Sequence, residues 1–326
     1  MSINPPGRDC QPPGSRRGPA GRLAITLSQA FSLVEVLLVV SLLSLIVLVL
    51  MTVFNSTQSA FRSGVTQSDV LEGGRAAMDL IVSDLKTMTA SGYTNNLQYQ
   101  GFTDTPQSSA NFFANFNFND YQPLLQSLPG SINGGLRTNV LENIFMLSRQ
   151  NLNGHDSWVG TGYTVNSTNV WPVYPLYRFV TNAPASSDPY YLLNTFLIAV
   201  EANAFTNIGW SHLIDGVVDF RVHAFDVNGY QMTNFAQYNS GQYTTYTNVW
   251  FGATQWGETG FSFFSNTIPA SVEIEMGKLE DRILQRAESL PTQNDVQSNY
   301  LSQQAGRVHV FRQRVLIPNV DPNVYP

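Results

Sequence analysis

The residue types best suited to metal binding or covalent catalysis are scattered through this sequence. The only cysteine, Cys10, precedes the main body of the chain, which therefore has neither a disulfide framework nor a thiolate site. The four histidines show no pair at metal-ligand spacing: His155, His212, His223 and His309. The sequence predicts no metal centre.

Motifs for nucleotides and for nucleophilic catalysis are also missing. The stretch GTGYTV, residues 160–165, begins like a dinucleotide-binding loop but lacks the third glycine and a following helix. There is no GxxxxGK phosphate loop and no GxSxG elbow. We therefore expect no catalytic residue, no cofactor and no enzymatic activity, although side chains that converge only in three dimensions escape such a search.

Two other groups of residues allow more than one interpretation. Asp226 and Asn228 before Gly229 could hold calcium, but a hairpin turn explains them more simply. Four phenylalanines could either form a face for carbohydrate or protein, or belong to a strand packed on the core: Phe112, Phe113, Phe116 and Phe118. The sequence leaves this second choice open.

Charge is distributed unevenly along the 326 residues. The first thirty residues hold four arginines and one aspartate, so the remainder has 13 basic and 22 acidic residues, a balance of −9. An acidic body repels a phosphate backbone, so we expect no nucleic-acid partner. The leader, 1–30, is rich in Pro and Gly and is predicted to be disordered.

One acid, Glu35, opens a long apolar run. The segment from Val36 to Phe54 has 19 residues, whose only polar members are small hydroxyls that can bond back to their own helix. Such a helix is about 28 Å long, close to the hydrocarbon core of a bilayer. Four arginines precede the run and only Arg62 lies in the twenty residues after it, so the N-terminus should stay cytoplasmic and the body should be exported.

The residues at the start of this run carry a family resemblance. AFSLVE, residues 30–35, resembles the class III signal of type IV prepilins and pseudopilins. In that family a basic leader is cut on the cytoplasmic side before a Phe that becomes N-methylated. The resemblance implies cleavage between Ala30 and Phe31, methylation of Phe31 and a role of Glu35 in subunit assembly. Ala30 replaces the usual Gly, and LAITLSQ separates Arg22 from the cut, which bears on cleavage efficiency.

The resemblance also offers a physical reason for a carboxylate at the start of the apolar run. A lone carboxylate in hydrocarbon costs a few kcal/mol, so it needs a partner. The new α-amine of one subunit would neutralise Glu35 of its neighbour and set their axial register. The alternative is that Glu35 lies at the level of the lipid headgroups and needs no partner.

The rest of the chain predicts an α+β fold, in which a long helix precedes an antiparallel, β-rich, pilin-like domain. We expect a transmembrane helix over 31–54, an amphipathic helix over 55–90 that bends near Gly73, and an exported domain over 91–326. Strands should alternate apolar and polar residues in GVVDFRVHAF, IPASVEIEM and RVHVFRQRVLIP, with a short amphipathic helix in LEDRILQRAESL.

This order resembles the J-type minor pseudopilins of type II secretion and the W-type minor pilins. The specific resemblance covers residues 28–88, and among prepilin-like groups the length and the Asn/aromatic composition fit the Verru_Chthon cassette proteins. It implies a single-pass protein of the bacterial inner membrane with a periplasmic domain, and as partners a prepilin peptidase and other pseudopilins or pilins. The competing class is an unprocessed, signal-anchored envelope protein whose β domain binds a ligand or acts as an adhesin.

Overall fold

The computed structural model describes residues 32–92, 110–116, 123–128, 135–166, 173–202, 205–233, 237–239, 242–244, 246, 248–255, 258–291 and 295–325. The chain divides into two compact units, Met1–Ser59 and Ala60–Pro326. The predicted cleavage residues Ala30 and Phe31 lie outside the described residues, as does Phe118.

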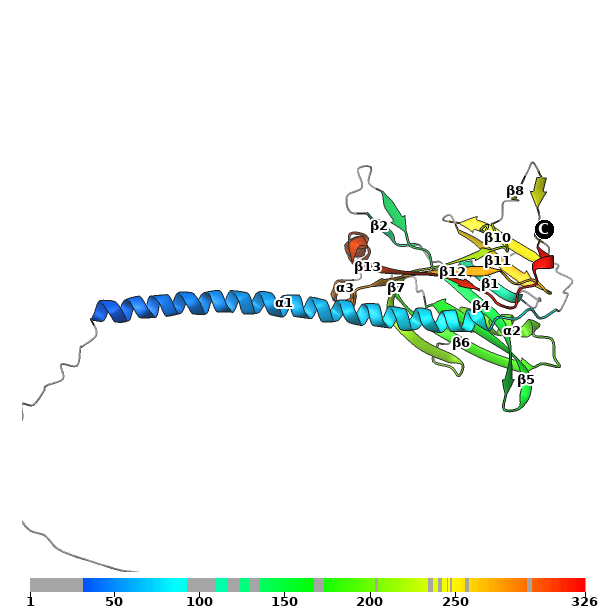
Figure 1. Cartoon of the computed structure of the whole chain (residues 1–326), viewed down its shortest axis with the longest axis horizontal. Coiled ribbons are helices and arrows are strands. Elements are labelled where there is room, and N and C mark those ends of the chain that lie inside the picture. Colours follow the sequence, from blue (N-terminus) through cyan, green and yellow to red (C-terminus); the bar gives the residue numbers. More distant parts are fainter. Residues whose placement is uncertain are drawn as a thin grey trace, which may run out of the picture. The chain divides into compact units, whose positions relative to one another are not determined.

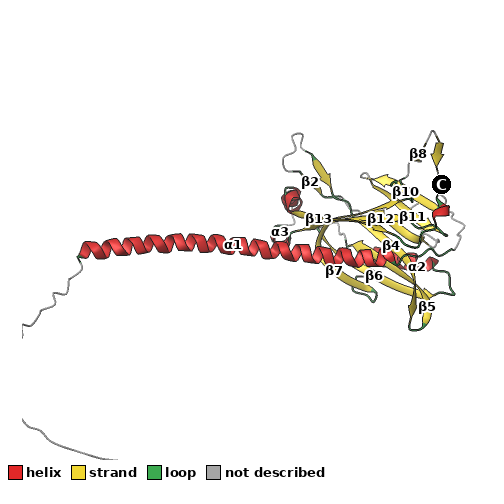
Figure 2. Ribbon diagram, in the orientation of Figure 1, coloured by secondary structure: helices red, strands yellow, loops and turns green. Residues whose placement is uncertain are grey.

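The described chain is α+β. Its helices are α1 (Leu33–Lys86), α2 (Tyr190–Glu201), α3 (Asp281–Glu288) and α4 (Val296–Ser302), with short 3-10 turns at Ala305–Arg307 and Pro322–Val324. Its strands are β1 (Ala110–Phe116), β2 (Leu125–Ser127), β3 (Leu136–Thr138), β4 (Glu142–Leu152), β5 (His155–Val165), β6 (Tyr174–Pro184), β7 (Trp210–Phe225), β8 (Gln237–Asn239), β9 (Gln242–Thr244), β10 (Val249–Gln255), β11 (Glu258–Phe264), β12 (Ser271–Leu279) and β13 (Val308–Leu316). Figure 1 labels most of them, and Figure 2 separates helices from strands by colour.

A nine-stranded sheet organises the body, with strand order β10-β11-β1-β4-β5-β6-β7-β12-β13. Neighbouring strands of this sheet are antiparallel. The prediction of a long apolar helix followed by a large antiparallel sheet is therefore confirmed. The three strands predicted from alternating residues are parts of β7, β12 and β13, and the helix predicted in LEDRILQRAESL is α3.

Helices pack on both faces of the sheet. Since side chains on a strand alternate between the two faces, one strand contributes to both cores. Ile144 and Met146 of β4 share a core with Ile81 and Leu85 of α1. Phe145 of the same strand points the other way, into a core with the apolar residues of α2. A smaller core lies under α3 and α4.

The last turns of α1 bury an apolar stripe formed by Met78, Ile81 and Leu85, and Met88 just beyond the helix is buried as well. Ion pairing also fixes this part of the helix. The Asp84 carboxylate accepts hydrogen bonds from the Tyr163 hydroxyl at 2.5 Å and from Arg178 Nε at 2.7 Å. Burial raises the pKa of the Tyr163 hydroxyl, and the adjacent Asp84 charge adds to the rise, so the phenol keeps the proton that it donates.

Several features of the body differ from the sequence-based expectation. The helix that was expected to reach residue 90 ends at Lys86; Thr87 and Met88 then form a tight turn, and the Thr89 N–H donates to the Leu147 carbonyl. The helix α2 was not predicted, although Leu192, Leu193, Phe196 and Val200 follow Pro189 at helical spacing. The helix α4 was not predicted either.

Of the two interpretations left open for Phe112, Phe113 and Phe116, the structure supports the strand packed on the core and not the exposed contact face. All three side chains are buried in β1, since this strand lies inside the sheet between β11 and β4. The glycines of GTGYTV lie within β5, and a Cβ on Gly162 would overlap the ring of Phe196 in α2. Their role is close packing of a helix on a strand.

Candidate functional site

The described residue of the predicted assembly site is Glu35, in the first turn of α1. Its Oε2 accepts a hydrogen bond from the backbone N–H of Ser32 at 2.9 Å, and the Glu35 N–H lies 3.3 Å from Ser32 Oγ. Ser32 and Glu35 thus form a capping box, in which an N-cap serine and a glutamate three residues later satisfy each other's backbone donors. The acid also complements the positive end of the helix dipole.

This geometry gives Glu35 a partner within its own chain, which the sequence interpretation missed. The signal was present, because S-x-x-E before an apolar run is typical of a helix start. One carboxylate oxygen is engaged by Ser32, and the described residues supply no hydrogen bond to the other, Oε1. A second donor can therefore bind Glu35 without breaking the capping box.

The helix that follows Glu35 is apolar on all sides and exposed. Every residue from Leu33 to Ser59 is exposed, and its large apolar side chains keep between 49% and 80% of their surface accessible. The segment is long and apolar enough to cross a membrane. The residues that the structure describes bury none of this apolar surface, which is large enough to mark a contact with a membrane or with another protein.

The few polar side chains of this segment are satisfied by the helix itself, as predicted. Ser41 Oγ donates to the Leu38 carbonyl and Ser44 Oγ to the Val40 carbonyl, both at 2.8 Å, while Thr52 Oγ1 donates to the Val49 carbonyl at 2.7 Å. Hydroxyls bonded in this way need no water, so the segment can lie in hydrocarbon without an unsatisfied donor.

A charged cluster connects strands of the body, and its members on β7, β12 and β13 lie on the sheet face away from α1. It consists of residues from six strands: Arg137, Glu142, Asp219, Arg221, His223, Glu258, Glu273, Glu275 and Arg312. Arg221 is at its centre, with Nε 3.0 Å from Asp219 Oδ1 and Nη1 2.8 Å from Glu258 Oε1. His223 Nε2 lies 2.8 Å from the other oxygen of Glu258. The sequence showed that Asp219, Arg221 and His223 share a face, but not that Glu258 of a distant strand joins them.

Most charges of this cluster are paired, and their pKa shifts follow from that. Burial raises the pKa of Glu258, but its hydrogen bonds with His223 and Arg221 outweigh burial, so the net pKa is lowered. Burial lowers the pKa of His223, and the contact with Glu258 reverses this shift, so the net pKa is raised. The pair is stabilised as an imidazolium and a carboxylate.

Glu142 is the exception in this cluster. Its side chain is buried, Oε2 accepts a hydrogen bond from the Val222 N–H at 2.6 Å, and Oε1 has no hydrogen-bond partner among the residues that the structure describes. Burial raises the pKa of Glu142 well above its usual range, and the nearby Glu258 charge raises it further. The carboxyl group is therefore held in its protonated form over a wider pH range than an exposed glutamate.

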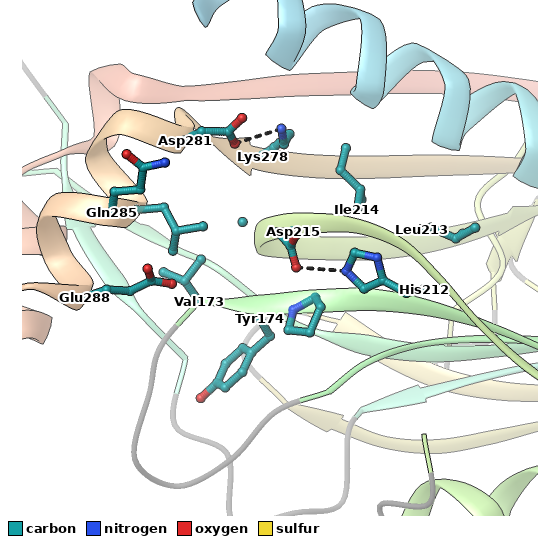
Figure 3. Close-up of a pocket in the computed structure, with 13 residues that line it drawn as sticks. Val173, Tyr174, His212, Leu213, Ile214, Asp215, Lys278, Asp281, Gln285 and Glu288 are labelled. Carbon is teal, nitrogen blue, oxygen red and sulfur yellow. Dashed lines mark hydrogen bonds and ion pairs between the residues drawn. The ribbon is translucent and has the colours of Figure 1, made fainter. Parts of the chain in front are cut away.

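The body also contains an open pocket of about 730 Å³ between the β6–β7 region and α3 (Figure 3). Leu213, Ile214 and Leu284 supply apolar surface. The bases that line it each lie beside a carboxylate, with Lys278 Nζ 3.0 Å from Asp281 and His212 Nε2 2.8 Å from Asp215. The pocket was not predicted, because residues 173–175 and 284–288 meet only in the folded chain.

The hairpin turn expected at Asp226 is present. Asp226 Oδ1 accepts the N–H groups of Asn228 and Tyr230, and the Gly229 N–H donates to the Asp226 carbonyl. Among the described residues, no group of three or more His, Cys, Asp or Glu side chains could hold a metal ion.

Two parts of the described chain thus have features of interest for function, and they differ in kind. The start of α1 combines an exposed apolar helix with a capped acid, while the charged cluster of the body consists mainly of ion pairs that connect strands. The chain was compared with protein-family models, with curated proteins and with solved structures, and none of the three comparisons found a match.

Proposed function

We propose that this chain is a minor pseudopilin or prepilin-like subunit of a type II secretion or type IV pilus-like filament. The observation that carries the proposal is the exposed apolar helix, which begins at the Ser32–Glu35 capping box immediately after Ala30 and Phe31. A prepilin peptidase would cut between Ala30 and Phe31, and Phe31 would become the methylated N-terminus.

The chemistry of assembly follows from the uncovered helix. Before assembly the bilayer covers its apolar surface, and in a filament the helices of neighbouring subunits take over that role. Oε1 of Glu35, which receives no hydrogen bond from the described residues, would accept one from the α-amine of the adjacent subunit, while Oε2 keeps its bond to Ser32. A paired charge of this kind sets the axial register of two helices, since any shift leaves both groups unpaired in hydrocarbon.

The body would then work in assembly or at the filament tip, on the periplasmic side of the inner membrane. The four arginines before the helix support this orientation, with the leader in the cytoplasm. Its partners would be the peptidase, other pseudopilins or pilins and the membrane, without nucleic acid or a cofactor. The proposal assigns the protein no catalytic step.

The test is the mass and N-terminal sequence of the membrane-extracted chain, produced with and without its own prepilin peptidase. We expect a chain that begins at N-methylated Phe31 only when the peptidase is present. Thiol labelling gives a second readout, because the only cysteine, Cys10, is lost with the leader. Ala30→Gly is the matched variant and should be cut at least as completely.

An intact Met1 end, or a cut near Ala60, in the presence of an active peptidase would contradict the proposal. Either result would favour the second class of function, an anchored or secreted protein whose β-rich body binds a ligand or acts as an adhesin.

A further inference from the structure

In the described part of the chain, the last strand of the sheet, β13, has an open edge. It pairs with β12 over nine consecutive residue pairs without a bulge, and it has no other neighbour in the strand order. Two hydrogen bonds define the phase of the ladder, from the Ile317 N–H to the Ala270 carbonyl at 3.0 Å and from the Glu280 N–H to the Arg307 carbonyl at 3.1 Å. In an antiparallel pair only alternate residues direct their backbone groups to the partner strand. Residues 309, 311, 313 and 315 therefore face β12, and residues 308, 310, 312, 314 and 316 face outward.

The outward groups of β13 are available to a ligand. The Val308 N–H donates to the Ala305 carbonyl, but the backbone N–H and C=O groups of the next four outward residues have no partner within the described ranges. These residues are Val310, Arg312, Arg314 and Leu316. An unbulged strand with free donors and acceptors is a template on which another extended chain can pair.

The side chains of the same four residues specify what could pair there. They share the face of the sheet opposite α1, with two arginines between two apolar residues. Val310 is 47% and Leu316 77% exposed. Arg312 contacts Glu273, and Arg314 stacks on the ring of Phe225 with Cζ 3.7 Å from its centroid, so both guanidinium groups are held beside the edge.

A second copy of the same edge is a poor partner. If two β13 strands paired antiparallel about Arg312, this residue would face its own copy, and a shift by one pair in one direction would place Arg312 opposite Arg314. Like charges directly opposite each other destabilise a strand pair. An acidic strand has the opposite effect, and β12 already illustrates the match, because Glu273 and Glu275 stand opposite Arg314 and Arg312 on the inner side.

We propose that the open edge of β13 binds an extended segment of another protein with the pattern apolar-x-acid-x-acid-x-apolar. Its acids would lie opposite Arg312 and Arg314, and its apolar residues opposite Val310 and Leu316. The segment would become a tenth strand, bound through the four outward-facing residues. This inference does not depend on processing at Phe31 or on Glu35.

The test uses the full chain in detergent micelles and two fluorescent peptides, VTETETL and its counterpart VTKTKTL. We expect saturable binding of the glutamate peptide, measured by fluorescence anisotropy, and binding of the lysine peptide weaker by about tenfold or more, since two attractive cross-strand pairs become repulsive. Hydrogen exchange should show new protection of the amides of Val310, Arg312, Arg314 and Leu316.

Val310→Pro is the decisive variant, with Val310→Thr as its matched control. Proline removes the outward N–H of residue 310 and keeps both arginines, and because this N–H does not bond to β12, the sheet should unfold at the same urea concentration. We expect Val310→Pro to lose binding and Val310→Thr to keep it.

Three results would overturn the proposal. The glutamate peptide could bind Val310→Pro as tightly as it binds the wild type. Binding would then rest on charge attraction alone and not on strand pairing. The two peptides could bind equally. The protein alone could form a dimer that Val310→Pro abolishes, which would make a second copy the occupant of the edge.

Discussion

At the scale of single residues, Glu35 combines two roles that chemistry can separate. As an acceptor it completes the capping box with Ser32, and as a charge it would pair with the amine of a neighbouring subunit. Glutamine can serve as the acceptor of a capping box but carries no charge. Leucine can do neither, so the two substitutions test different contributions of the same side chain.

We predict that Glu35→Gln keeps the helix start and loses assembly. Its unpaired amine partner would remain charged in hydrocarbon, so filament yield should fall by about tenfold or more, as the cost of a few kcal/mol for an uncompensated charge implies. Assembly is measured by sedimentation of sheared filaments or by cysteine crosslinking between adjacent subunits, and processing is followed by mass.

Ser32→Ala is the control for the capping box, because it removes the N-cap hydroxyl and leaves the charge. Wild-type assembly by Glu35→Gln would refute a role for the charge. If Glu35→Gln assembles normally while Glu35→Leu and Ser32→Ala do not, the residue acts as a helix cap only.

At the scale of elements, the glycines of α1 combine a local cost in helix propensity with a role in tertiary packing. Gly73 and Gly74 were expected to bend the helix, because glycine is unfavourable in a helix interior. A Cβ on Gly74 would overlap the ring of Phe311 in β13, and a Cβ on Gly73 would lie 3.3 Å from Ile214 Cδ1. The two glycines let the helix approach the sheet, and this packing compensates their low helix propensity.

We predict that Gly74→Ala destabilises the body although alanine is the better helix former. Overpacking against Phe311 should cost about 1–3 kcal/mol. The measurement is urea unfolding of the full chain in micelles, followed by tryptophan fluorescence, since all five tryptophans follow residue 60.

Gly64→Ala is the matched control, because nothing lies within 4 Å of a Cβ at that position of the same helix. It should leave the unfolding midpoint unchanged or raise it, by up to about 1 kcal/mol from helix propensity. A Gly74→Ala variant that is as stable as Gly64→Ala would show that close packing on Phe311 does not limit the helix.

At the scale of the whole molecule, the charged cluster connects segments that are far apart in the sequence. Asp219 of β7 accepts from Arg137 Nη2 at 2.8 Å and from the Val140 N–H at 2.7 Å, and Arg221 continues the connection to Glu258 of β11. The protonation of such a cluster affects the stability of the entire body, because folding and proton binding are linked.

We predict that Glu142 makes the body less stable as pH rises. Its pKa is raised in the folded state, so from about pH 4.3, where an unfolded glutamate ionises, up to its folded pKa the native state holds a proton that the unfolded state releases. The contribution of Glu142 to the free energy of unfolding is complete below this pH range. It decreases as the pH rises through the range, by no more than about 1.4 kcal/mol per pH unit.

Glu142→Gln removes this titration and keeps an acceptor for the Val222 N–H. The stability of the variant relative to the wild type should therefore rise between pH 4.5 and pH 8, on the order of 1 kcal/mol or more. Urea unfolding at several pH values measures the difference, and Glu288→Gln, at an exposed position on α3, controls for the loss of a carboxylate. A pH-independent difference would mean that Glu142 is ionised in the folded protein.

The sequence by itself determined those features that depend on neighbours along the chain. The apolar run of α1, its self-satisfied hydroxyls and the alternation in β7, β12 and β13 are local patterns, because helices and strands repeat every 3.6 and 2 residues. The capping box was equally local and could have been found. The α+β class followed from these elements in their order.

Only the tertiary structure decided what depends on residues that meet across the fold. The order of the nine strands, the burial of Phe112 and Phe113, and the edge position of β13 follow from pairing between distant segments. The approach of Gly74 to Phe311 and of Arg221 to Glu258 likewise has no signature in either local stretch. Burial in the folded core sets the protonation of Glu142. Close packing against the sheet explains two glycines whose helix propensity is low.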